Sequence, residues 1–164
     1  MINRYPKEAV ITLLHVDYKK CLLQLRDFKS SIAFPGVWGG FGGQIEKGES
    51  PKLAGCRELK EELGYSPNRI SYFRDYHFDK FVACDKTDVH LHVCYGGLKV
   101  PISDLVLTEG QDMGLFTRSE IIEGKLYSQK LGRKLPIPDH MVDIFLDFFD
   151  FISSGQRQHP SKEK

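Results

Sequence analysis

The chain has 164 residues, which is the length of one ordinary folded domain and leaves no room for a second core. Hydrophobic residues make up 41% of it and charged residues 27%, a mixture that excludes an intrinsically disordered protein. Its 23 Lys and Arg nearly balance its 22 Asp and Glu, and the net charge of +1 gives no electrostatic reason to expect a nucleic acid as partner.

The cysteines and the apolar segments predict where the protein works. The four cysteines are far apart and form no C-x-x-C pair, as expected for free thiols in a reducing cytosol. Residues 1–8 lack the apolar core of a secretory signal, and no apolar segment approaches the roughly 18 residues that span a bilayer. We therefore expect a cytoplasmic protein without a membrane partner, with one domain over residues 1–152 and a flexible polar tail over residues 153–164.

The N-terminal part of the chain predicts a β-hairpin followed by a loop. Residues 9–16 and 21–26 are rich in aliphatic residues and are separated by a short polar turn, which is the pattern of two paired strands. Residues 27–36 are expected to form a loop, and a glycine-dense stretch follows over residues 38–49.

The next segment has the signals of a helix over residues 51–63. Ser50 is a good N-cap, and Pro51 suits the first helical position because its missing N–H has no hydrogen bond to make there. Gly64 is a common residue just past a helix end. Beyond this helix, strands are expected over 70–77, 89–98 and 112–116, a short helix over 119–124 and a last helix over 140–152. This order of elements predicts the α/β class, with helices packed on a mixed β-sheet.

Three carboxylates lie on one face of the helix over residues 51–63. Glu58, Glu61 and Glu62 are spaced at i, i+3 and i+4, so like charges crowd together unless something offsets them. A hard cation such as Mg²⁺ or Mn²⁺ would do so, because these ions prefer carboxylate, carbonyl and water oxygens. The alternative is an ordinary solvated face, with Arg57 and Lys60 as partners.

The sequence around this helix resembles the Nudix box. That box reads G-x₅-E-x₇-R-E-U-x-E-E-x-G-U, in which U is a bulky apolar residue. All its positions are filled here, by Gly43, Glu49, Arg57, Glu58, Leu59, Glu61, Glu62, Gly64 and Tyr65. The preceding loop departs from the Pro-Gly-Gly usual in the family and reads Phe41-Gly42-Gly43. The resemblance implies a Nudix-type α/β/α sandwich with a mixed β-sheet.

The resemblance also implies roles for individual residues. Four glutamates would be both the catalytic residues and the metal ligands, and the backbone carbonyl of Gly42 would join them: Glu58, Glu61, Glu62 and Glu109. Glu109 belongs to the string Glu-Gly-Gln, which is similar to an element of the MutT-type branch. Gly43, Glu49 and Arg57 would support the site, with Glu49 pairing with Arg57 to hold the loop against the helix. The implied cofactor is Mg²⁺ or Mn²⁺.

The substrate side is predicted from fewer residues. Arg26 ends a predicted strand where relatives often place an arginine that contacts phosphate or base, although a solvated charge at a strand end is equally compatible. Trp38 and Phe41 are candidates for stacking on a nucleobase, with core packing as the alternative for Trp38.

We expect a metal-dependent hydrolase in which water attacks a diphosphate bond of a nucleoside diphosphate derivative. A ribo- or deoxyribonucleoside triphosphate, including an oxidised or noncanonical one, is the first candidate. A nucleotide sugar of the GDP-mannose kind or a dinucleotide is the alternative. A module that senses nucleotides without cleaving them is the non-enzymatic alternative, but such domains usually lose glutamates of the box, and here all are present.

Two features outside the box remain. His90, His92 and Cys94 alternate along one predicted strand and share one of its faces, so a zinc site is an alternative to pocket lining or plain sheet surface. No further Cys or His pair stands nearby to complete such a site. The last predicted helix carries more apolar residues than one sheet-facing stripe needs, including Phe149 and Phe151, which allows a homodimer.

Overall fold

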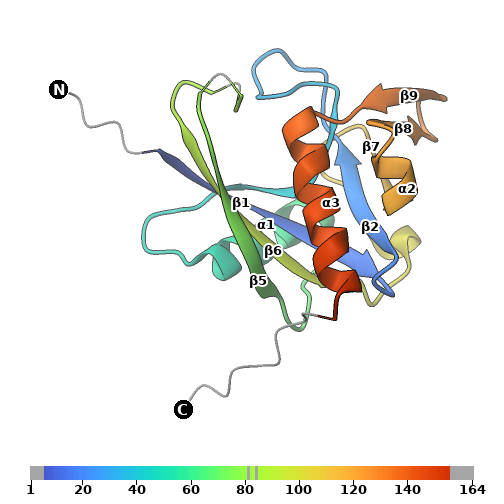
Figure 1. The fold of residues 1–164 in the computed structure, drawn as a ribbon, viewed down its shortest axis with the longest axis horizontal. Coiled ribbons are helices and arrows are strands. Elements are labelled where there is room, and N and C mark those ends of the chain that lie inside the picture. The colour runs from blue at the N-terminus through green and yellow to red at the C-terminus, as the bar shows by residue number, and fades with distance from the viewer. Residues whose placement is uncertain (1–5, 81, 84, 156–164) are drawn as a thin grey trace.

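The computed structural model describes residues 6–80, 82–83 and 85–155, and a mixed β-sheet forms its centre (Figure 1). The predicted hairpin is confirmed, because β1 (Lys7–Val16) and β2 (Lys20–Leu25) pair antiparallel. The second half of β1 and nearly all of β2 are buried, as expected for aliphatic strands covered on both faces.

The later strands extend this sheet on both sides of the hairpin. β6 (Val89–Gly97) runs parallel to β1, and β5 (Ser71–Phe78) pairs antiparallel with β6 at one edge. β7 (Asp112–Thr117) pairs antiparallel with β2. The sheet therefore contains both parallel and antiparallel pairs, as the sequence predicts.

The glycine-dense stretch differs from the prediction of a loop, since it contains two short strands. β3 (Trp38–Gly39) pairs with β2, and β4 (Phe41–Gln44) pairs with the first half of β1. Glycine has a low intrinsic strand propensity, so only the long-range hydrogen bonds to β1 and β2 make these residues strands. The pairing of β4 fixes the chain just before the helix that carries the acidic residues.

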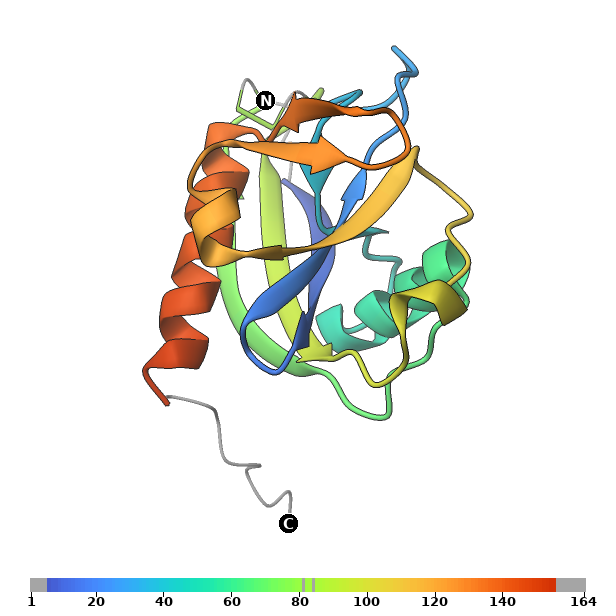
Figure 2. The same ribbon diagram turned by 90° about the vertical axis from the view of Figure 1, so that its right-hand side faces the viewer.

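Two helices cover opposite faces of the sheet and give the predicted three layers (Figure 2). Neighbouring residues of β1 point to different sides, so Leu13 packs in the same core as α3 (Asp139–Ser153), whereas Leu14 packs against α1 (Pro51–Leu63). A short helix, α2 (Arg118–Ile121), and a 3₁₀ helix, η1 (Ile102–Asp104), complete the connections.

The ends of α1 are those that the sequence predicts. The Ser50 hydroxyl accepts a hydrogen bond from the Leu53 amide at 3.3 Å, and Pro51 opens the helix. Gly64 ends the helix with a φ of 62°, a left-handed conformation that glycine adopts without steric cost. The positions of the glutamates along α1 are thus fixed by signals at both ends.

A second, two-stranded sheet lies beside α3 and is not evident from the sequence. β8 (Lys125–Ser128) pairs with β9 (Arg133–Pro136), and their buried leucines, Leu126 and Leu135, join the core under α3. Each strand has four residues and a charged, glycine-containing connection, so its local pattern is too short to predict a strand.

The surplus apolar residues of α3 are covered within the chain. Phe149 is buried, and Phe151 packs against Phe73 and Tyr95 at ring distances of 4.9 and 5.6 Å. A homodimer stays a prediction. Within the described residues, no helix combines the length and the apolar character needed to cross a membrane. Of the predicted polar tail, residues 156–164 lie outside the described part of the chain.

Candidate active site

Glu62 in the last turns of α1 is a buried carboxylate. Its residue is only 5% exposed, and the Gln24 side-chain amide donates to its Oε1 at 3.3 Å. Its Oε2 is buried and has no hydrogen-bond partner among the described residues. Burial raises the pKa of Glu62 to about 7, the Gln24 hydrogen bond opposes this, and the Glu58 and Glu109 carboxylates add to the rise. A buried carboxylate oxygen without a hydrogen-bond donor is well suited to bind a cation.

Glu62 forms part of the wall of a cavity of about 300 Å³. Four of the other residues that line this cavity were predicted from the sequence as site residues: Arg26, Gly42, Gly43 and Glu109. They come from the end of β2, from β4 and from the loop before β7, so the sheet brings together segments that are far apart in the sequence. A cleft with several converging charged groups is the usual form of a small-molecule site.

Gly43 lets the backbone of β4 approach the side chain of Glu58. A Cβ added to Gly43 would lie 2.4 Å from Glu58 Oε1, so any larger residue would push that carboxylate away. Burial raises the pKa of Glu58, while its ion pair with Arg57 lowers it. At Gly42, an added Cβ would lie 1.9 Å from the Val10 carbonyl oxygen, which explains why glycine is required on this side of β4.

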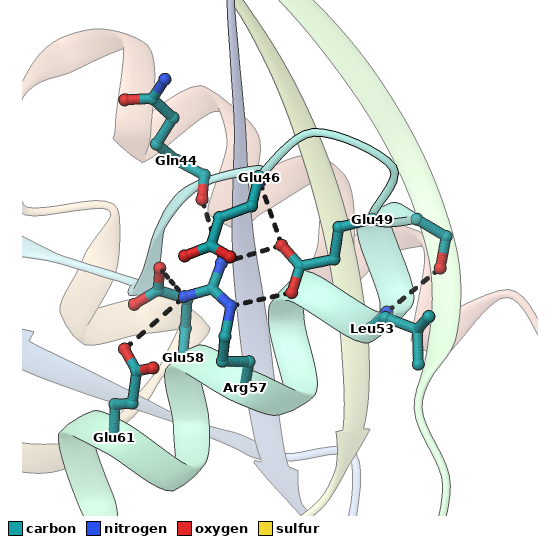
Figure 3. Close-up of polar contacts among 8 residues, drawn as sticks. Gln44, Glu46, Glu49, Leu53, Arg57, Glu58 and Glu61 are labelled. Carbon is teal, nitrogen blue, oxygen red and sulfur yellow. Dashed lines mark hydrogen bonds and ion pairs between the residues drawn. The ribbon is translucent and has the colours of Figure 1, made fainter.

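Arg57 connects the glycine-containing loop to α1 (Figure 3). Its Nε and Nη2 donate to the two carboxylate oxygens of Glu49 at 2.8 and 2.9 Å, and Nη2 also donates to the Gln44 carbonyl at 3.1 Å. This bidentate pair lowers the pKa of Glu49 to about 2. The predicted pairing of Glu49 with Arg57 is therefore present, and it holds residues 44–49 against the helix.

The same guanidinium also contacts two glutamates of α1. Arg57 Nη1 lies 2.9 Å from Glu58 Oε1 and 3.5 Å from Glu61 Oε2 (Figure 3). Neither Glu58 nor Glu61 lines the cavity with Glu62, and the Glu61 side chain is 60% exposed. Glu58 faces the glycine strand, whereas Glu61 lies at the surface beside Arg57.

Glu109 is held at the cavity by the residues on either side of it. Asp27 accepts hydrogen bonds from the Gly110 amide at 3.3 Å and from the side-chain amide of Gln111. The Thr108 amide donates to the Glu62 carbonyl at 2.9 Å, and its hydroxyl donates to the Glu61 carbonyl at 2.7 Å. The loop is thus attached to the end of β2 on one side and to the last turn of α1 on the other.

Arg26 is a basic residue of the cavity wall, which Lys7 also lines. Its Nε donates to the Ala33 carbonyl at 2.9 Å, which fixes the guanidinium beside the acidic groups. Burial lowers the pKa of Arg26, and the Glu62, Glu109 and Asp27 carboxylates oppose this change. Arg26 therefore lies at the cavity with its guanidinium charged, and its contact with substrate stays a prediction.

The two predicted stacking residues belong to the core instead. Trp38 and Phe41 are both fully buried, so neither presents a ring face to a ligand, and the prediction that they contact substrate was wrong. The Trp38 indole N–H donates to the Leu126 carbonyl at 3.0 Å, and its ring packs edge-on against Phe116 at 4.9 Å. The sequence shows an aromatic residue in a strand but not which face of the sheet it occupies.

Other aromatic residues take the place at the cavity. Phe34, Phe78 and His140 line it, and the His140 ring lies 5.0 Å from each phenylalanine ring. Burial lowers the pKa of His140, which favours its neutral, apolar form. The sequence did not predict these three residues as cavity residues. They come from a loop, the end of β5 and the start of α3, and no motif or spacing in the sequence connects these segments.

Gln24 and Asp27 are the polar residues that sequence reasoning also missed. Gln24 is buried and bonds both to Glu62 and, at 3.0 Å, to the Gly40 carbonyl. Its one available signal was a polar residue inside an otherwise apolar strand, Cys21–Leu25. Asp27 follows Arg26 directly and carries no local signal, since its partners lie on a distant loop.

Comparison with known proteins agrees with this geometry. The family model described as NUDIX domain matches residues 5–127. The chain is similar to the crystal structure of a MutT protein from Methanosarcina mazei Go1, with 19% identity, 96% of this chain and 100% of that chain covered and a TM-score of 0.69. A MutT NUDIX hydrolase from Burkholderia pseudomallei gives 19% identity, 88% and 98% coverage and a TM-score of 0.65.

A third similar structure contains a ligand. It is the NUDIX domain of Shewanella oneidensis NrtR in complex with ADP ribose, with 16% identity, 92% of this chain and 90% of that chain covered and a TM-score of 0.66. At these identities the three structures establish the fold, whereas the family model covers most of the chain, including the whole box. The chain therefore belongs to the Nudix hydrolase family.

Proposed function

We propose that this protein hydrolyses a diphosphate bond in a nucleoside diphosphate derivative, with a ribo- or deoxyribonucleoside triphosphate as first candidate and Mg²⁺ or Mn²⁺ as cofactor. Oxidised or otherwise noncanonical triphosphates are included. The observation that carries the proposal is Glu62, a buried carboxylate with one oxygen that lacks a partner among the described residues, placed beside Arg26 in a cavity.

The residues present fit a hard divalent cation. Glu62 and Glu109 at the cavity, with Glu58 close enough to raise the pKa of Glu62, would supply carboxylate oxygens, which Mg²⁺ and Mn²⁺ prefer, and Gly42 lines the same cavity. When bound, the ion neutralises charge that grows on the phosphoryl oxygens and makes water a better nucleophile. Glu61 is the least favoured of the predicted ligands because its side chain is exposed.

The remaining chemistry is assigned to residues of the chain. Arg26 binds a phosphate group, because a guanidinium fixed at the cavity wall matches phosphate oxygens in charge and shape. Glu109, on the loop held by Asp27, accepts the proton that the attacking water loses. Arg57 and Glu49 position the loop and do not contact the substrate.

The aromatic end of the cavity supports a nucleoside rather than an inorganic polyphosphate. A flat base can pack against the rings of Phe34, Phe78 and His140, while its phosphates extend toward Arg26 and Glu62. The similar NrtR domain was crystallised with ADP ribose, so a dinucleotide or a nucleotide sugar is the second candidate.

The test is hydrolysis of a substrate panel with and without Mg²⁺ or Mn²⁺, with the products separated by ion-exchange chromatography. The panel contains the common ribo- and deoxyribonucleoside triphosphates, 8-oxo-dGTP, GDP-mannose and ADP-ribose. We expect triphosphate cleavage that stops on chelation and is abolished by Glu62→Gln. Glu123→Gln is the matched control, since Glu123 pairs with Lys134 at the surface.

Each other outcome has a definite reading. Nucleotide binding without cleavage of any panel member would identify a sensing module and contradict the proposal. Turnover that survives chelation would contradict the metal assignment. Preferred cleavage of ADP-ribose or GDP-mannose would move the substrate to the second candidate and leave the site assignment intact.

A further inference from the structure

A cluster of histidines and carboxylates lies on the sheet, outside the candidate active site. Glu8 of β1 stands opposite His90 of the parallel strand β6, and His92 follows on the same face of β6. Their neighbours Ala9 and Leu91 line the substrate cavity, whereas Glu8, His90 and His92 are not among its lining residues. The cluster is therefore distinct from the cavity.

Three potential ligand atoms meet in this cluster. Glu8 Oε1 lies 3.1 Å from His90 Nδ1, and Glu8 Oε2 lies 2.7 Å from His92 Nε2. The side chains offer ligand atoms that all lie within 4.8 Å of one another. A tetrahedral ion with bonds of about 2.0–2.1 Å to nitrogen and oxygen keeps its ligand atoms roughly 3.3 Å apart. The ligand atoms, at separations of at most 4.8 Å, exceed that spacing by no more than about 1.5 Å.

Asp75 is placed to orient His90 in such a site. Its Oδ2 lies 2.7 Å from His90 Nε2, so with an ion on Nδ1 the remaining ring hydrogen would sit on Nε2 and be held by this carboxylate. A carboxylate behind a ligating imidazole is a recurring feature of zinc sites. In His92, Nδ1 is buried and has no partner within the described part of the chain, which leaves Nε2 as the nitrogen presented to Glu8.

The exposure of the three side chains suits a site that an ion can enter. The two imidazoles are 20% and 15% exposed and are held by the strand, while the Glu8 side chain is 45% exposed. Two imidazole nitrogens and one carboxylate oxygen form a donor set that Zn²⁺ accepts well, whereas Mg²⁺ prefers oxygen alone. Cys94, which follows on the same strand face, is buried in a separate apolar cluster and does not belong to this set.

We propose that Glu8, His90 and His92 form a zinc site, with water as the fourth ligand and Asp75 as the residue that orients His90. This site is independent of the Nudix box and of the proposed nucleotide hydrolysis. Zinc here would join the beginning of β1 to β6, and both strands also contribute residues to the cavity wall.

The test is zinc binding to metal-free protein, measured by competition with a chromogenic chelator, with Co²⁺ absorption as the probe of geometry. It is done in the Glu62→Gln background so that the box binds metal less well. We expect one zinc per chain, the intense visible bands of four-coordinate Co²⁺ and a higher Tm on zinc addition. His92→Ala and the more conservative Glu8→Gln should each weaken binding at least about tenfold.

His77→Ala is the matched control. His77 stacks on His90 at 4.0 Å and lies 3.5 Å from Asp75, yet it is not in the proposed ligand set, so its loss should leave zinc affinity within about twofold of the parent. Equal affinity in His92→Ala and the parent would overturn the proposal, as would the absence of zinc binding. Loss of zinc in His77→Ala with retention in His92→Ala would assign the metal to Asp75, His77 and His90 instead and contradict the ligand set.

Discussion

Glu62 gives the metal-free protein a pH dependence with a definite sign. In the folded chain its pKa is about 7, against 4.5 for an ordinary glutamate. Between these two values the folded protein holds a proton that the unfolded chain has lost, so the free energy of unfolding falls as the pH rises from about 4.5 to 7. The loss amounts to about 3 kcal/mol as an upper figure.

The measurement is urea unfolding in a chelating buffer from pH 5 to 8, for wild type and Glu62→Gln. Glutamine does not titrate, so the difference in unfolding free energy between the two proteins isolates this residue. We expect wild type to lose stability relative to the variant as the pH rises. A constant difference across the range would show that Glu62 ionises at its ordinary pKa.

Asp27 is expected to act on turnover through the Glu109 loop. Asp27→Ala removes the acceptor for the Gly110 amide and the Gln111 side chain, which loosens the loop, although the Gln111 backbone amide still donates to the Leu25 carbonyl at 2.8 Å. We expect kcat to fall about 10- to 100-fold, with little change in KM and a small change in Tm. Asp104→Ala on the exposed 3₁₀ helix is the control. A KM effect without a kcat effect would place Asp27 in substrate binding.

For single residues, the sequence predicted which side chains pair within the box, but not which side chains the fold buries. Glu49 and Arg57 were identified as a pair from their place in the box, and the structure contains that pair. Trp38 and Phe41 were assigned to substrate because aromatic rings suit bases, but burial depends on the face of the sheet. The role of Gln24 could not be predicted from the sequence, because its partner Glu62 lies on another element.

At the scale of elements, α1 offers a matched pair of leucines. Leu59 is fully buried against the sheet, whereas Leu53 on the same helix is 63% exposed. Leu59→Ala leaves a cavity and should lower the free energy of unfolding by about 2–5 kcal/mol, while Leu53→Ala should change it by less than about 1 kcal/mol. Urea unfolding of both variants is the measurement. Similar losses would mean that α1 is not anchored through Leu59.

Elements whose own residues mark their ends were predicted correctly. Strands that form only by pairing with distant strands were not predicted. The helix over 51–63 was correct to the residue because Ser50, Pro51 and Gly64 mark its ends. The strand over 41–44 was expected as a loop, since its glycines become a strand only through pairing with β1. The hairpin of β8 and β9 follows the same rule, because its two leucines are buried by a core built from other elements, including α2 and α3.

For the whole molecule, binding of Mg²⁺ should appear as added stability. An ion that binds only the folded protein raises the free energy of unfolding by about 2.7 kcal/mol at 100 times its Kd. Thermal unfolding with increasing Mg²⁺ should therefore raise the Tm of wild type, and the rise should be much smaller in Glu62→Gln. An equal rise in both proteins would place the bound ion elsewhere.

The arrangement of the whole chain was predictable only in outline. The order of elements indicated a mixed sheet between helices, which is correct. The parallel pairing of β1 with β6 was not visible, and it is this pairing that places Glu8 beside His90. Contacts between residues so distant in the sequence are decided by the packing of the complete fold.

The attachment of Thr108 to the last turn of α1 limits where this chain can be cut. Proteolytic nicking or circular permutation between Leu107 and Thr108 would turn the Thr108 amide into a charged terminus and weaken its bonds to the Glu61 and Glu62 carbonyls, so the Glu109 loop would lose its attachment to α1. New termini at Gly132, in the turn between β8 and β9, would leave these bonds untouched. A permutant opened at that turn should keep its acidic cluster, which makes the position suitable for inserting a reporter domain.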